Sequence, residues 1–222
     1  IEALSGVNFS VDKGEFVVVA GASGAGKSTI LNILGGMDSP TSGEIIVDGK
    51  YINDYSNKEL ITYRRYDIGF VFQFYNLVPN LTVEDNVMLP VLLDGKKIKD
   101  YREKLDEILE TVGLSDRINH TPRELSGGQQ QRCALARTLV TDPEILLLDE
   151  PFSAADGHTK HILESELIKI IKSNLHKPVL LVTHNIEEAY RLSERIMIID
   201  HGTTFQTASK KTIIDHPNTL NA

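Results

Sequence analysis

The 222-residue sequence predicts an α/β domain with a mainly parallel sheet, an N-terminal antiparallel β subdomain and an inserted helical subdomain. Five short apolar runs do not alternate with polar residues, which is typical of strands buried on both faces of a parallel sheet. Stretches with helical periodicity separate some of these runs. Hydrophobic residues make up 41% and charged residues 24% of the chain, a globular mixture that excludes disordered and fibrous classes.

The predicted elements follow one another along the chain as alternating strands and helices. The apolar runs predict strands at Phe16 to Ala20, Ile68 to Phe72, Ile145 to Leu148, Val179 to Val182 and Ile196 to Ile199. Apolar residues at helical spacing predict one helix from Tyr101 to Val112, ended by Gly113, and another across 163–171. This alternation favours right-handed crossovers within one sheet.

Two regions do not fit the parallel sheet. Residues 3–19 and 43–52 contain alternating segments, the second with an Asp48-Gly49 turn signal, and these predict antiparallel strands. Residues from about 74 to 140 show helical patterns and no convincing strand. We therefore expect one domain, 1–222, in which 1–73 and 141–222 form the core and about 74–140 form a helical insertion.

Charge and cysteine content restrict the partners. There are 23 basic and 31 acidic residues, a net charge of −8, and no basic run stands out, so nucleic acid is not expected as a partner. No apolar stretch approaches the ~18 residues that span a bilayer, so any membrane role is expected through a partner. A single cysteine, Cys133, excludes a disulfide framework and fits a reducing, cytoplasmic compartment.

A phosphate-binding loop follows the first predicted strand. The run Gly21-Ala22-Ser23-Gly24-Ala25-Gly26-Lys27-Ser28-Thr29 matches G-x-x-x-x-G-K-[ST] between a strand and a helix. Glycines allow backbone N–H groups to curl round phosphates, and the helix N-terminus adds its dipole. Lys27 is expected to reach the β- and γ-phosphates and Ser28 to bind Mg²⁺. The alternative is a glycine-rich turn that only caps a helix, and the strand–helix context argues against it.

Two carboxylates end the buried strand at 145–148. Asp149 and Glu150 are expected at the carboxyl end of a parallel strand, where α/β sheets bind ligands. Asp149 would hold Mg²⁺, as the aspartate of a Walker B motif does, and Glu150 would polarise the attacking water. Alone the pair is weak, because strands often end in acidic residues; together with the phosphate loop it predicts a nucleotide-hydrolysing site.

The run Leu125-Ser126-Gly127-Gly128-Gln129 gives the family resemblance. With it the chain resembles the ATP-binding cassette (ABC) ATPases, the motor subunits of ABC transporters, whose signature motif is Leu-Ser-Gly-Gly-Gln. The motifs occur in the family's order over nearly the whole chain. The resemblance implies a P-loop NTPase core, a Mg-dependent ATPase with ATP as substrate, Gln73 as a residue that touches Mg²⁺, and His184 as a contact of the γ-phosphate.

The family mechanism implies a head-to-tail dimer that forms on ATP binding. Each nucleotide would lie between one subunit's phosphate loop and the partner's Ser126, Gly127, Gly128 and Gln129. The resemblance also implies a transmembrane permease partner, with the chain peripheral on the cytoplasmic face of the membrane. Ala155 stands where the family usually has leucine, so we expect a weak dimer. The family's adenine-stacking aromatic residue would lie about a strand and a loop before residue 3. Either the sequence is truncated there or the aromatic residue is absent, and in the second case weaker ATP affinity is expected.

Subfamily features differ between the two halves. Residues 66–90 resemble cassettes of the lipoprotein-releasing and macrolide-export type, whereas the part after Glu150 resembles importer cassettes for molybdate or other oxyanions. Substrate and direction of transport stay open. Two other functions also stay open: a non-transport ABC ATPase that acts on cell-envelope machinery, and an ATP-binding module with little hydrolysis. Intact Glu150 and His184 argue against the second of these.

Overall fold

A six-stranded sheet organises the fold. In the computed structural model, which describes residues 3–153, 157–174, 177–216 and 218, the strand order is β4-β5-β6-β1-β7-β8. All neighbouring pairs are parallel except β7 and β8. The strands are β1 (Phe16–Ala20), β4 (Ile68–Val71), β5 (Ile145–Asp149), β6 (Val179–Thr183), β7 (Arg195–Asp200) and β8 (Thr203–Ser209). Each of the five strands predicted from apolar runs is present.

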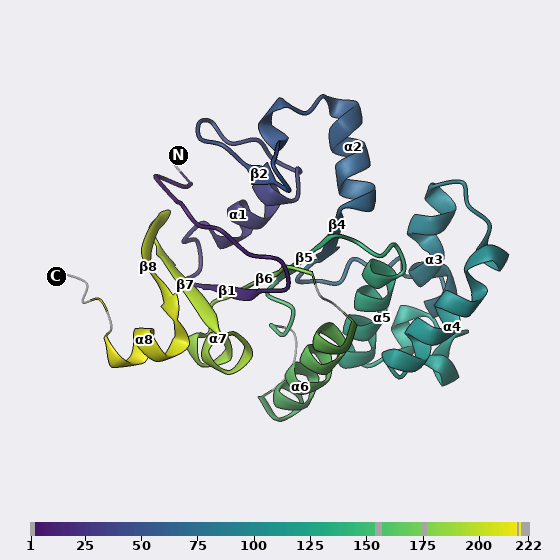
Figure 1. Cartoon of the computed structure of the whole chain (residues 1–222). Coiled ribbons are helices and arrows are strands. Elements are labelled where there is room, and N and C mark those ends of the chain that lie inside the picture. Colours follow the sequence, from purple (N-terminus) through teal and green to yellow (C-terminus); the bar gives the residue numbers. More distant parts are fainter. Residues whose placement is uncertain (1–2, 154–156, 175–176, 217, 219–222) are drawn as a thin grey trace.

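Helices cover both faces of this sheet (Figure 1). α1 (Lys27–Leu34) and α2 (Asn57–Tyr66) pack on one face, and the other face carries α5 (Gly127–Leu139), α6 (Gly157–Asn174) and α7 (Ile186–Leu192). Each face of the sheet has its own hydrophobic core. Val17 and Val19 of β1 pack in the core beside α1 and α2, and Val18 and Ala20 pack in the core on the opposite face. This two-sided burial is why the strands are continuously apolar.

The chain leaves the sheet after β4 and returns at β5 through helices alone. This stretch contains α3 (Val83–Leu93) and α4 (Arg102–Thr111) before α5, and residues 74–140 include no strand, as predicted. In Figure 1, α3 and α4 lie at the end of the molecule opposite β7 and β8. The remaining helices are α8 (Lys210–Asp215) and the 3₁₀ turns η1 (Ile52–Asp54), η2 (Ile98–Tyr101), η3 (Ser115–Arg117) and η4 (Pro122–Glu124).

The predicted turns and helix ends also appear. β2 (Ile46–Val47) and β3 (Lys50–Tyr51) form an antiparallel pair, and the turn between them uses positive φ at Asp48 (47°) and Gly49 (74°). Such turns match the twist of paired strands. Gly113, with φ of 64°, follows the end of α4.

The prediction of antiparallel strands across residues 3–19 is wrong. Residues 3–15 contain no strand, and β1 pairs in parallel with β6 and β7. The alternating pattern is still physically meaningful, because Val7, Phe9 and Val11 are half-buried against the core beside α1. No neighbouring strand among the described residues offers this segment a ladder of backbone hydrogen bonds. Alternation therefore indicated a buried side of the segment without the pairing that makes a strand. Ala155, for which the sequence predicted a weaker dimer contact, lies outside the described residues.

Candidate nucleotide-binding site

The phosphate loop connects β1 to α1. Gly24 and Gly26 adopt φ of 80° and 100°, in the region that only glycine enters without strain. Gly26 is the N-cap of α1 and supplies no side-chain hydrogen bond to the helix. The first N–H groups of a helix have no intrahelical partner and attract anions. The loop is therefore built to offer backbone donors to a phosphate group.

Close packing requires glycine at two positions of the loop. A Cβ on Gly21 would lie 2.2 Å from the carbonyl oxygen of Ile199, and a Cβ on Gly26 would lie 2.7 Å from that of Ala3. Both obstacles are backbone atoms, which cannot move aside without displacing their chain segments. The loop is thus pressed against β7 and the N-terminal segment.

Lys27 is buried beneath the loop. Its side chain donates from Nζ to the carbonyl oxygens of Gly21 (3.0 Å) and Ala22 (2.9 Å), and only 4% of the residue is exposed. Its Nζ also lies 3.8 Å from Oε1 of Glu150. A buried ammonium group needs such partners to offset its lost hydration. These contacts hold the lysine cation at the floor of the phosphate loop.

Asp149 and Glu150 lie beside this loop at the carboxyl end of β5. Ser28 donates from Oγ to Oδ1 of Asp149 at 3.1 Å. Burial, with the nearby charge of Glu150, raises the pKa of the Asp149 carboxyl, although the Ser28 hydrogen bond and Lys27 oppose this shift. Glu150 has a φ of 43°, a strained conformation for a non-glycine residue and one found disproportionately at functional sites.

Glu150 connects the phosphate loop to His184. Its Oε2 lies 2.9 Å from Nδ1 of His184, whose side chain is 51% exposed. Main-chain hydrogen bonds bring the segments together: Gly21 donates to the carbonyl of Thr183 (3.3 Å) and Glu150 to that of Val182 (3.1 Å). Three sequence-distant segments thus meet at the end of β6.

Gln73 follows β4 and is half-buried, but its side chain makes no hydrogen bond to any residue that the structure describes. The loop beyond it has positive φ at Tyr75 (60°) and Asn76 (47°). Arg137 of α5 donates to the carbonyl oxygens of both, at 2.6 and 2.7 Å. Nothing in the local sequence pattern distinguishes Arg137 from a solvated helix residue, so this anchor could not be predicted from the sequence.

The signature residues begin α5. Ser126 caps the helix by accepting from the backbone N–H of Gln129 (3.3 Å), and the Gln129 side chain accepts from the backbone N–H of Ser126 (2.9 Å). A Cβ on Gly128 would lie 2.5 Å from Leu163, whereas Gly127 faces open space. Within the described residues, the signature makes no hydrogen bond or ion pair to the phosphate loop. The single chain does not unite these two motifs.

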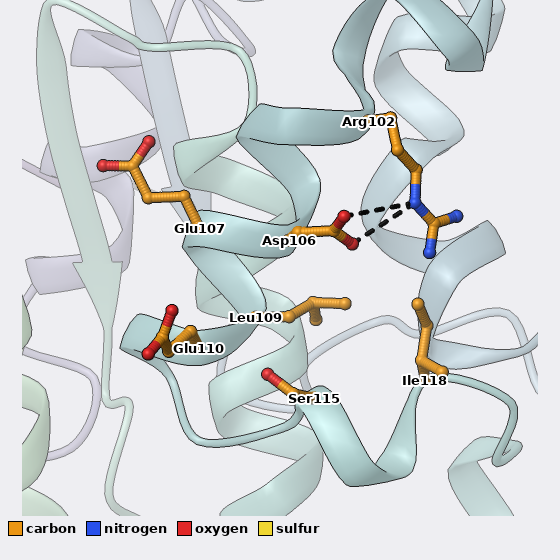
Figure 2. A pocket seen from close by; sticks show the side chains of 7 residues that line it. All are labelled: Arg102, Asp106, Glu107, Leu109, Glu110, Ser115 and Ile118. Atoms are coloured by element: carbon orange, nitrogen blue, oxygen red, sulfur yellow. Dashed lines mark hydrogen bonds and ion pairs between the residues drawn. The ribbon is translucent and has the colours of Figure 1, made fainter.

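Two cavities lie away from the phosphate loop. One of about 500 Å³ sits beside α4 and η3 (Figure 2), where Arg102 pairs with Asp106. Its lining residues are Arg102, Asp106, Glu107, Leu109, Glu110, Ser115 and Ile118, none of them from the phosphate loop. His184 is half exposed, so the candidate site can be reached from outside the chain at this residue. Among the described residues, no helix is long and apolar enough to cross a membrane.

Comparison with known proteins identifies relatives over nearly the whole chain. The chain is 41% identical over 219 residues to the trimethylamine N-oxide transport system ATP-binding protein TmoW of Pelagibacter ubique, covering 99% of this chain and 64% of that protein. It is 39% identical over 203 residues to the lipoprotein-releasing system ATP-binding protein LolD of Bacteroides thetaiotaomicron, covering 91% and 92% of the two chains.

A solved structure agrees in fold. The dimeric post-hydrolysis state of the ATP-binding cassette MJ0796, bound to ADP and Pi, superimposes with a TM-score of 0.81 at 40% identity and covers 94% of this chain and 90% of that one. The family model for the ABC transporter matches residues 4–153, which include the phosphate loop, the signature and the acidic pair. With these motifs and this fold, the chain belongs to the ABC transporter family of ATP-binding cassettes.

Proposed function

We propose that the chain binds and hydrolyses ATP and so drives a membrane-spanning permease partner. The observation that carries this proposal is the continuous set of contacts from Lys27 through Glu150 to His184, beside the Ser28–Asp149 pair. Relatives named as ATP-binding proteins of transport systems support the transport role. The chain spans 64% of the length of one of these relatives, TmoW.

The phosphate loop binds and orients ATP. Lys27 is already held by two carbonyl oxygens, so little side-chain entropy is lost when it meets the β- and γ-phosphates. The loop at residues 21–29 supplies backbone N–H groups, with Ala22, Ser23, Ala25 and Thr29 shaping its path around the phosphates. A fixed cation and a fixed helix terminus stabilise the charge that develops on the transferred phosphoryl group.

Ser28 and Asp149 fit a magnesium ion. Their Oγ and Oδ1 atoms are hard oxygen donors already 3.1 Å apart, and the pKa of Asp149 is raised by burial and by the Glu150 charge. A divalent cation at this position would relieve that electrostatic cost. We propose the side-chain oxygen of Gln73 as a further ligand of this ion. When bound, the ion would polarise the phosphoryl oxygens as a Lewis acid.

Glu150 acts as the general base. Its carboxylate lies between Lys27 and His184, which orient it, and it accepts a proton from the attacking water. His184 is exposed on the open side, where it contacts the γ-phosphate. Glu150 combines a strained φ of 43° with a carboxylate that lies 3.8 Å from Nζ of Lys27 and 2.9 Å from Nδ1 of His184.

The site is completed by a second copy of the chain. Ser126, Gly127, Gly128 and Gln129 present a helix N-terminus that makes no hydrogen bond or ion pair to the phosphate loop among the described residues, and MJ0796 forms a dimer bound to ADP and Pi. The proposal places the chain on the cytoplasmic face of the membrane, attached through its permease. Residues 1–73 and 141–222 then form the nucleotide-binding core, and residues from about 74 to 140 form the helical subdomain.

Replacing Glu150 with glutamine tests this proposal. Steady-state ATP hydrolysis should fall by about 10²–10⁴-fold, because the general base is lost while the side-chain shape is kept. ATP binding, followed by calorimetry, should persist. Glu144→Gln, an exposed carboxylate before the same strand, is the matched control and should hydrolyse ATP at the wild-type rate. Near-wild-type turnover in Glu150→Gln would remove Glu150 from the catalytic role.

A further inference from the structure

A buried polar cluster lies directly behind His184 and has no part in the chemistry described above. Thr183 and Glu188 are 2% and 3% exposed. A carboxyl group so deeply buried costs free energy unless its oxygens are engaged. Oε1 of Glu188 is buried without a hydrogen-bond partner among the described residues, so this carboxyl is retained at an energetic cost.

Hydrogen bonds connect this carboxyl to both flanks of His184. The hydroxyl of Thr183 donates to Oε2 of Glu188, and the Thr183 hydroxyl oxygen itself accepts from the backbone N–H of Asn185 at 3.0 Å. The Asn185 side chain accepts in turn from the backbone N–H groups of Glu187 (2.9 Å) and Glu188 (3.1 Å). His184 is therefore bracketed by two residues whose positions depend on the Thr183 hydroxyl.

The cluster is tied to the neighbouring helix as well. Nζ of Lys160 on α6 lies 3.7 Å from Oε2 of Glu188, and Arg191 of α7 donates to both oxygens of Glu164 on α6 at 3.0–3.1 Å. The charged groups that face Glu188 are thus Lys160, Glu164 and Arg191. Burial raises the pKa of the Glu188 carboxyl, against the lowering effect of its Thr183 hydrogen bond and of Lys160.

We propose that Glu188 is a positioning residue for ATP hydrolysis, which holds His184 against Glu150 through the hydroxyl of Thr183. The inference rests on the proposed hydrolytic function. The backbone N–H of Gly21 donates to the Thr183 carbonyl, so the same residue also aligns the phosphate loop with His184. A shift of about 1 Å in a catalytic group costs up to about 10²-fold in rate, so a rigid support behind His184 has a kinetic consequence.

A purely structural role would have different consequences. If Glu188 only docked α7 on α6, its loss would lower the amount of folded protein and leave the turnover of the folded fraction unchanged. A positioning role predicts a lower kcat with little change in KM, a changed environment at the His184 ring, and dependence on His184 itself. These three readouts separate the two roles.

The variants are Thr183→Val, which removes only the hydroxyl, and Glu188→Met, which removes the acceptor at similar size. Each should lower kcat about tenfold or more and leave KM for ATP within about threefold. Glu188→Gln keeps an acceptor for the Thr183 hydroxyl and should recover most of the loss. Glu187→Gln is the matched control, since Glu187 is the adjacent carboxylate with an 82% exposed side chain, and it should behave as wild type.

Imidazole nitrogen NMR signals of His184, assigned with His184→Gln, provide a readout that needs no turnover. They should move in Thr183→Val and Glu188→Met and coincide with wild type in Glu187→Gln. In the His184→Gln background, Glu188→Met should lower kcat no further. The proposal is overturned if folded Thr183→Val has a kcat within about twofold of wild type, or if the His184 signals do not move in that variant. Absent hydrolysis by the wild-type chain would instead overturn the proposed function, and the NMR comparison would still decide the positioning role.

Discussion

Asp149 is placed where its charge is unfavourable. Its carboxyl is partly buried next to Glu150, so the folded-state pKa is raised above the unfolded value of about 3.8. A raised carboxyl pKa means that the folded protein holds the proton more tightly than the unfolded chain. The resulting cost to stability is present above the folded-state pKa and disappears as the pH falls below the unfolded value. The magnesium ion that we propose at this position would offset this cost.

Asp149→Asn should therefore stabilise the protein while it impairs hydrolysis. The amide oxygen still accepts from Ser28, and the ionisation cost is removed, so the midpoint of thermal unfolding at pH 7 should rise by about 2–4 °C. The gain over wild type should shrink as the pH is lowered towards 4. Asp142→Asn is a control of opposite sign, because Lys177 lowers the pKa of that carboxyl and its removal should destabilise the fold at pH 7. Unfolding scans across pH test both.

At the scale of elements, α5 connects two parts of the site. Its first residues form the signature, and its later residue Arg137 holds the loop beyond Gln73 by two hydrogen bonds to strained backbone. Gln131, between them, donates to the carbonyl of Pro151 just after the acidic pair at 2.7 Å. A movement of α5 would thus displace the signature and strain the hydrogen bonds to the loop beyond Gln73 and to the segment that follows β5.

Arg137→Met should destabilise the protein and loosen the Gln73 loop. Two hydrogen bonds from a charged group are lost, and the carbonyls of Tyr75 and Asn76 lose that donor, so we expect about 2–3 kcal/mol less stability to urea. Amide hydrogen exchange should rise across residues 73–77 in particular. Arg123→Met, at an exposed position before the same helix, is the matched control. Equal stability of the two variants would contradict the anchoring role.

At the scale of the whole molecule, the proposed site needs a second chain. Among the described residues, the signature turn makes no hydrogen bond or ion pair to the phosphate loop. Two chains arranged head to tail would bring each signature to the partner's nucleotide. In that arrangement ATP would be part of the interface, since the helix N-terminus at Ser126 attracts an anion.

The Glu150→Gln variant should dimerise with ATP and stay monomeric with ADP, which lacks the γ-phosphate. Adding Ser126→Arg, which puts a bulky side chain where the partner's γ-phosphate lies, should abolish the dimer and leave ATP binding by the monomer intact. Light scattering with each nucleotide, with calorimetry of the monomer, measures both effects. A dimer that survives Ser126→Arg would show that the signature does not complete the site in trans.

The sequence by itself determined the elements and most of the candidate residues. Local rules suffice for these: glycine spacing for the phosphate loop, continuous apolar runs for β5 and β6, and the Asp48-Gly49 pair for the hairpin. Family resemblance added Gln73 and His184. The alternating pattern of residues 3–15 misled, because alternation reports a buried side and says nothing about a pairing partner.

Only the tertiary structure decided which groups meet. Lys27, Glu150 and His184 are far apart along the chain and come within 2.9–3.8 Å because three parallel segments end at one edge of the sheet. The support given by Glu188 to Thr183, and by Arg137 to the Gln73 loop, had no local signal, since a glutamate in a first helical turn and an arginine in a helix are ordinary features. Their roles come from burial and from hydrogen bonds across elements, which depend on the packing of the complete fold.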